Sequence, residues 1–210
     1  MSKKVDARGM RAGITKDWKA TWFAEDDMYS KYLLEDDAIR KYIAKLLRGA
    51  GIDEILIERS IKAVKITIRV SRPGIVIGKK GSGLMTMRLG LSKLTKSDIE
   101  LQIEEMKLPN MSANIVAETI ALQLEKRISA RRAMNVAAER AMESGAMGVR
   151  IEIAGTIQGP NSIAGQEMVS KGAVPTQTLR ADIDFAKAVS YTRGGTIGIK
   201  VWINKGEISS

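Results

Sequence analysis

The chain has 210 residues and a formal net charge of +10, from 34 Lys and Arg against 24 Asp and Glu. It contains no Cys and no His, which removes disulfides, thiolate nucleophiles and the commonest general base and metal ligand. Its longest uncharged stretch, residues 153–166, is too short to cross a bilayer. These features predict a basic protein that binds nucleic acid, with no membrane, no small-molecule substrate, no cofactor and no metal.

The positive charge is concentrated in the first two thirds of the chain. Residues 141–210 hold seven Lys and Arg against six Asp and Glu, so nearly all of the net charge lies before them. Residues 1–36 form a basic arm and lead-in whose first 30 residues are expected to be irregular. We expect Trp18 and Trp22 to dock on the chain's own core. The arm residues predicted to contact RNA phosphates are Lys3, Lys4, Arg8, Arg11 and Lys16.

Apolar periodicity predicts helices and strands in a regular order along the rest of the chain. The segments are a helix over 36–49, strands over 52–59 and 64–70, a helix from Ser82 with that serine as its N-cap, a strand over 98–104, a helix from near Ser112 that closes on Lys126 and Arg127, a helix over 131–144, and strands over 149–153, 179–185 and 196–203. Residues 155–178 are expected to form turns. This order predicts an α+β fold with two modules in series.

The sharpest local motif is Gly78-Lys79-Lys80-Gly81, which lies between an apolar run and a predicted helix. Two glycines let the backbone turn sharply and approach a phosphate, and the two lysines add positive charge. KH domains use a Gly-x-x-Gly loop to clamp single-stranded RNA. Two strands precede this loop and its helix, and a strand and a helix follow, which is the order of a type II KH module. A plain turn is the competing interpretation.

Longer motifs resemble the family of bacterial-type ribosomal protein S3. They are residues 72–81, residues 179–184 (Leu-Arg-Ala-Asp-Ile-Asp), residues 198–203 followed by 205–208, and residues 131–134 (Arg-Arg-Ala-Met). The resemblance implies an N-terminal type II KH domain followed by a C-terminal α+β domain with a mostly antiparallel sheet. The implied boundaries are an arm over 1–36, a KH core over 37–108 that continues into the helix 112–130, and a C-terminal domain over 131–210.

The resemblance also implies a function. Members of this family sit on the head of the small ribosomal subunit in the cytoplasm of bacteria or in organelles. They bind small-subunit rRNA and neighbouring ribosomal proteins, line the entrance of the mRNA channel and contribute to mRNA unwinding. The RNA-binding residues expected on this basis, together with the charge pattern, are Arg72, Gly78, Lys79, Lys80, Gly81, Lys126, Arg127, Arg131 and Arg132. Arg127 and Arg131 are four residues apart, so a continuous helix would place them on one face.

Six positions depart from the family pattern, and two of them, Asp6 and Ala7, stand where the family usually has a His-Pro pair. Asn135 stands where the family usually has a basic residue, Thr156 and Gly165 stand where it has arginines, and Met168 replaces an aromatic residue. Each lost arginine is expected to remove about one phosphate contact.

Two other functions remain open from the sequence. A free KH-domain regulator or RNA chaperone would use the same glycine loop without needing the C-terminal domain. A nuclease would need bound metal, and Asp182 and Asp184 are the candidate ligands. These two acids have no third acid nearby in the sequence, so we expect a binding protein that is not an enzyme and has no catalytic residues.

Overall fold

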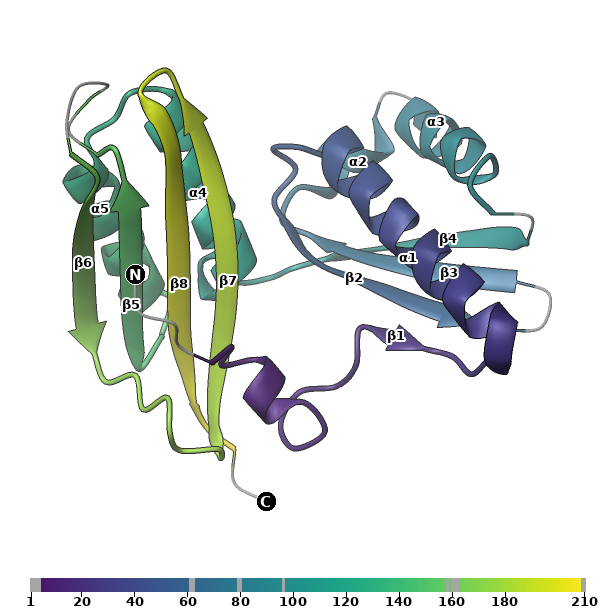
Figure 1. Cartoon of the computed structure of the whole chain (residues 1–210), viewed down its shortest axis with the longest axis horizontal. Helices are drawn as coiled ribbons and strands as arrows, with labels where there is room; N and C mark the ends of the chain where they lie inside the picture. The colour runs from purple at the N-terminus through teal and green to yellow at the C-terminus, as the bar shows by residue number, and fades with distance from the viewer. Residues whose placement is uncertain are drawn as a thin grey trace. The chain divides into compact units, whose positions relative to one another are not determined.

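The computed structural model describes residues 5–60, 63–78, 81–95, 97–157, 159 and 163–208. Two compact units are present (Figure 1). The N-terminal unit is Trp18–Lys107, and the C-terminal unit combines Met1–Asp17 with Leu108–Ser210. The chain therefore passes from one unit to the other twice. This division differs from the predicted boundaries, because the start of the arm and the helix after residue 112 both belong to the C-terminal unit.

The N-terminal unit contains helices on one side of a four-stranded sheet (Figure 1). Strands β2 and β3 are antiparallel, whereas β4 runs parallel to β3 and the short β1 runs parallel to β2. The predicted order of helix, two strands, helix pair and strand is confirmed. In chain order the elements are β1 (Ala20–Thr21), α1 (Asp26–Leu46), β2 (Ile52–Arg59), β3 (Ala63–Val70), α2 (Pro73–Ile77), α3 (Ser82–Leu91) and β4 (Asp98–Glu105).

Period-two alternation in the strands builds the core of this unit. Ile66 and Ile68 of β3 are fully buried and belong to one cluster with Ile39 of α1 and Met87 of α3. Burying each such side chain contributes about 1.5–3 kcal/mol. Gly90 lies inside α3, where a Cβ would come within 1.9 Å of the Tyr42 hydroxyl. This glycine therefore allows α1 and α3 to pack closely.

Helix α1 begins at Asp26, well before the predicted start at residue 36. In its first half Leu33 and Leu34 are exposed, and the first residue that α1 contributes to the buried core is Ile39. Trp22 precedes the helix and donates from Nε1 to the Asp36 carboxylate at 2.8 Å, as expected for docking on the chain's own core. Trp18 is 70% exposed, so that half of the expectation is wrong.

The C-terminal unit is a four-stranded antiparallel sheet in the order β6-β5-β8-β7, with α4 and α5 covering one face (Figure 1). The predicted α+β class with an antiparallel C-terminal sheet is confirmed. The elements are α4 (Ala113–Glu125), α5 (Ala130–Glu143), β5 (Gly148–Gly155), β6 (Gly165–Gly172), β7 (Ala181–Thr192) and β8 (Gly195–Glu207), with short 3-10 turns at Gly9–Arg11 and Pro109–Met111. Among the described residues, no helix is both long and apolar enough to span a bilayer.

Strand β6 lies in the segment that the sequence predicted to be turns. It is an edge strand, and none of its residues is fully buried. Because polar side chains occupy both of its faces, the alternation that reveals a half-buried strand is missing. Pairing with β5 over the whole of its length defines it as a strand.

Candidate nucleic-acid interface

The glycine turn, residues 78–81, joins α2 to α3. Gly78 ends α2 with φ 68°, and Gly81 precedes α3 with φ 80°. Both values lie in the region that a Cβ disfavours, which explains why glycine is required at both positions. Lys79 and Lys80 lie outside the described residues. Ser82, predicted to be the N-cap, is instead the first residue of α3, and Gly81 takes the cap position without a capping side chain.

Helices α2 and α3 also meet closely at the turn. A Cβ on Gly83 would lie 2.3 Å from the carbonyl oxygen of Val76, so only glycine allows this approach. The predicted site residue Arg72 is exposed at the start of α2. Close backbone packing thus holds the two helices on either side of the turn.

An open groove of about 530 Å³ begins at the glycine turn and runs between α3 and the edge strand β4. Such a volume falls within the usual range of ligand sites. The lining is mainly apolar, with one arginine and one glutamate; it consists of Gly81, Leu84, Met85, Arg88, Ile99, Glu100 and Leu101. No sequence pattern indicates this groove, because the space between α3 and β4 depends on how these two consecutive elements pack.

A second candidate surface is the basic turn, which we define as Lys126, Arg127, Arg131 and Arg132. All four side chains are exposed. None has a hydrogen bond or ion pair with another residue in the described part of the chain. Lys126 and Arg127 follow the end of α4, and Arg131 and Arg132 lie in the first turn of α5. These four predicted RNA-binding residues therefore flank one short connection and present exposed positive charge.

The backbone of the basic turn differs from the prediction. Helix α4 ends at Glu125, and α5 begins at Ala130. Arg127 therefore lies in the turn, with φ 62°, and does not share a helix face with Arg131. The N–H of Arg127 donates to the Leu124 carbonyl at 2.9 Å, and the N–H of Ile128 donates to the Gln123 carbonyl at 3.1 Å. These two bonds form a Schellman motif that fixes the turn.

The arm candidates that the structure describes, Arg8, Arg11 and Lys16, do not form a third basic surface. Arg11 is fully buried. Its guanidinium donates four hydrogen bonds to backbone carbonyls of the C-terminal unit, at Ala7 (2.8 Å), Ala181 (2.7 Å), Thr176 (3.2 Å) and Thr178 (2.8 Å). Burial lowers the pKa of Arg11, and the nearby Asp182 carboxylate opposes that shift. The prediction that Arg11 contacts RNA is therefore wrong, since its side chain is buried and four of its five N–H donors bind carbonyl oxygens of the chain.

The other described arm cations also face carboxylates. Lys16 lies 2.6 Å from Asp182, and Arg8 lies 3.9 Å from Asp184. Both acids belong to β7, so the arm is attached to the C-terminal sheet by opposite charges. The remaining two arm candidates, Lys3 and Lys4, lie outside the described residues.

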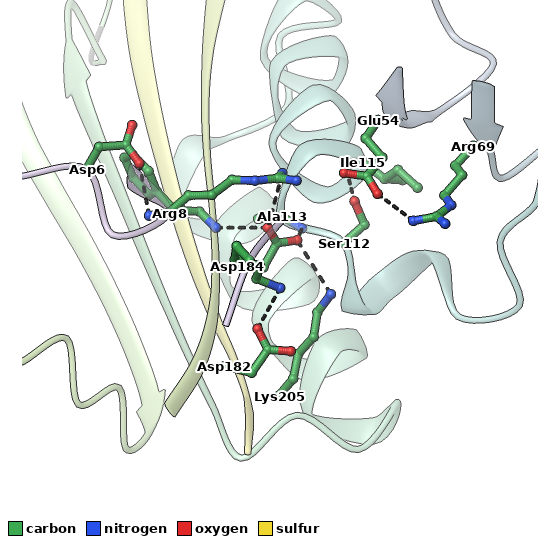
Figure 2. Close-up of polar contacts among 12 residues, drawn as sticks. Asp6, Arg8, Glu54, Arg69, Ser112, Ala113, Ile115, Asp182, Asp184 and Lys205 are labelled. Atoms are coloured by element: carbon green, nitrogen blue, oxygen red, sulfur yellow. Dashed lines mark hydrogen bonds and ion pairs between the residues drawn. The ribbon is translucent and has the colours of Figure 1, made fainter. Parts of the chain in front are cut away.

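Asp184 and Asp182 have structural roles that argue against a nuclease site. Asp184 accepts hydrogen bonds from the N–H of Ala113 at 3.0 Å and of Phe185 at 3.1 Å, and its carboxylate lies 3.7 Å from Lys205 (Figure 2). A carboxylate at the start of α4 stabilises that helix. Across the described residues, no group of three acidic side chains is arranged to hold a metal ion.

Two family models match the chain. The model for the KH domain matches residues 38–110, and the model for the ribosomal protein S3 C-terminal domain matches residues 120–203. The first match covers the glycine turn and the groove, and the second covers the basic turn and the antiparallel sheet.

Curated relatives match along nearly the whole chain. A protein of Caldanaerobacter subterraneus is 50% identical, and one of Caldicellulosiruptor saccharolyticus is 48% identical; each match covers 99% of this chain and 94% of the relative. A Shewanella protein is 45% identical over 99% of this chain and 90% of its own length. All three are named small ribosomal subunit protein uS3, a name that describes a ribosomal component, in agreement with the expectation that the chain is not an enzyme. This protein therefore belongs to the uS3 family of small ribosomal subunit proteins.

Proposed function

We propose that the chain is a structural constituent of the small ribosomal subunit head, where it binds rRNA and contacts neighbouring ribosomal proteins. Its relatives are named as proteins of that subunit, and they match over almost its full length. The further proposal is that it lines the entrance of the mRNA channel and contributes to mRNA unwinding. The observation that carries this second step is the basic turn.

The basic turn suits RNA backbone because its charges are exposed and lack partners among the described residues. Each phosphate that an arginine or lysine neutralises releases condensed counterions, which favours binding at low salt. Guanidinium groups also match phosphate oxygens with two parallel hydrogen bonds. Contacts to backbone phosphates hold a strand without reading its sequence. These properties are expected of a site that contacts structured mRNA of any sequence.

The glycine turn and its groove support a second RNA contact, to a single strand. Gly78 and Gly81 carry no Cβ, so a phosphate can approach their backbone closely. The mainly apolar groove that begins at Gly81 has a volume of about 530 Å³ and would receive unstacked bases. A free KH-domain regulator would use the same contact, so this feature does not separate the two functions.

Sedimentation distinguishes a ribosomal protein from a free KH-domain regulator. In a sucrose gradient of cell lysate, we expect the protein in the small-subunit peak, and we expect it to stay there in moderate salt. Recovery only in the light fractions would contradict a ribosomal role and favour the free regulator.

The unwinding role is tested with ribosomes that carry Arg131→Ala and Arg132→Ala together. Because the two side chains are exposed, subunit assembly should be unchanged, whereas translation through a stable mRNA hairpin should slow. The matched control is Arg193→Ala, which removes an exposed arginine far along the chain from the basic turn. The measurement is the ratio of translation rates for structured and unstructured messages. Equal ratios in the variant and the control would disprove the unwinding role.

A further inference from the structure

Arg127 has a backbone conformation that its residue type disfavours. Throughout the described part of the chain, every other residue with positive φ is a glycine. An L-residue in the left-handed region brings its Cβ close to the following carbonyl oxygen, and this costs stability. Within the described residues, Arg127 is thus the one residue that carries this backbone strain.

The end of α5 shows how the same turn is built without strain. The N–H groups of Gly145 and Ala146 donate to the carbonyls of Met142 at 3.0 Å and Ala141 at 3.2 Å. This is the same pair of bonds that ends α4, and Gly145, with φ 98°, takes the place that Arg127 takes there. Glycine is the usual residue at this position. The backbone therefore gives no reason for an arginine at the end of α4.

The side chain of Arg127 also has no stabilising partner. It makes no hydrogen bond or ion pair with another described residue. A cation near a helix C-terminus interacts favourably with the helix dipole, but the adjacent Lys126 already supplies one. The two backbone bonds of the turn fix the Cα of Arg127, so its guanidinium projects from a rigid base.

We propose that Arg127 is a preset phosphate contact of the basic turn, retained there in spite of its cost to stability. Its ligand is the phosphodiester backbone of RNA, held through the guanidinium fork. A rigid base reduces the conformational freedom that binding must remove, which raises affinity without a new contact. This inference rests on the proposed RNA-binding role of the basic turn and assigns to Arg127 a part separate from that of the two arginines in α5.

The test compares stability and RNA binding in the full chain. Arg127→Gly relieves the strain and removes the guanidinium, so the melting temperature should rise by about 2–4 °C. Its affinity for a fluorescein-labelled RNA hairpin with a single-stranded extension should fall, and the salt slope should decrease by about one. Arg127→Ala should show the same loss of binding without the gain in melting temperature.

Gly145→Ala is the matched control, because it introduces the same strain at the end of α5 and changes no charge. It should lower the melting temperature and leave RNA binding unchanged. A lower melting temperature in Arg127→Gly would overturn the proposal, since the guanidinium would then stabilise the helix end. Unchanged affinity and salt slope in Arg127→Gly would also overturn it.

A further variant separates this inference from the proposed function. If Arg131→Ala with Arg132→Ala weakens binding while Arg127→Gly does not, only the role of Arg127 fails. If both leave binding unchanged, the basic turn as a whole is not an RNA site.

Discussion

The N-terminal arm and the basic turn are both rich in cations, and the sequence predicted RNA contacts for both. In the arm, Arg11 is buried among carbonyl oxygens, and Lys16 and Arg8 face the carboxylates of β7. In the basic turn, all four side chains are exposed and lack partners within the described residues. The same residue types therefore attach one segment to the fold and leave the other free to bind.

This difference shows that the count of cations is a poor guide to an RNA surface. A cation that is buried among carbonyl oxygens or paired with an acid has fewer free donors and less unbalanced charge to offer a phosphate. What distinguishes the two segments is a set of distant partners, at residues 176–184, which lie more than 160 positions after the arm residues that they contact. If these partners decide the role of each cation, removing an arm cation should change stability, and removing a cation of the basic turn should change RNA binding.

The largest effect is expected from Arg11→Ala. This change leaves four backbone carbonyls without their donor in a buried site, and breaking such a network costs about 3–5 kcal/mol. Urea unfolding of the full chain should show this loss, and the salt slope of RNA binding by the folded fraction should stay the same. Arg11→Lys should restore little of the stability, because an ammonium cannot reproduce the planar fork. If Arg11→Ala changed the salt slope without a loss of stability, Arg11 would be an RNA contact and not a structural residue.

A second effect is expected at the glycine turn, where a substitution should change RNA binding and leave stability nearly unchanged. Lys79→Asp with Lys80→Asp reverses two charges beside an open groove, so binding of a single-stranded RNA oligonucleotide should weaken and its salt slope should fall by about two. The melting temperature should stay nearly constant, because the turn is held by Gly78, Gly81 and Gly83. A collapse of the fold would instead show that the lysines are structural. Lys45→Asp with Lys41→Asp, on the exposed side of α1, is a control of equal charge.

Features with a short-range signal were predictable from the sequence. Alternation in 64–70 identified β3, and the two glycines at 78 and 81 identified a turn whose φ values require them. Ser112 was placed at the start of α4, where its side chain accepts a hydrogen bond from the N–H of Ile115 at 3.3 Å. In each case the residues that decide the structure lie within a few positions of one another.

Features that depend on distant partners were missed. The first half of α1 does not bury its leucines in the core, and β6 has polar residues on both faces, so β6 lacks the alternation of a half-buried strand. The burial of Arg11 depends on carbonyls at the other end of the chain. One hypothesis treated Asp184 as a metal ligand, whereas its carboxylate accepts a hydrogen bond from the first N–H of α4. No local pattern marks such pairs, because the fold alone brings them together.

The smallest effect, and the most direct comparison, comes from two single substitutions. Lys16→Ala removes a partly buried ion pair with Asp182, so it should cost up to about 1 kcal/mol and leave the salt slope of RNA binding unchanged. Arg132→Ala removes an exposed cation without a described partner, so stability should be unchanged and the salt slope should fall by about one. Both variants lose one positive charge, so a general effect of net charge would lower the two slopes equally. A lower slope in Arg132→Ala alone would establish that local partners, and not total charge, decide which cations reach the phosphates.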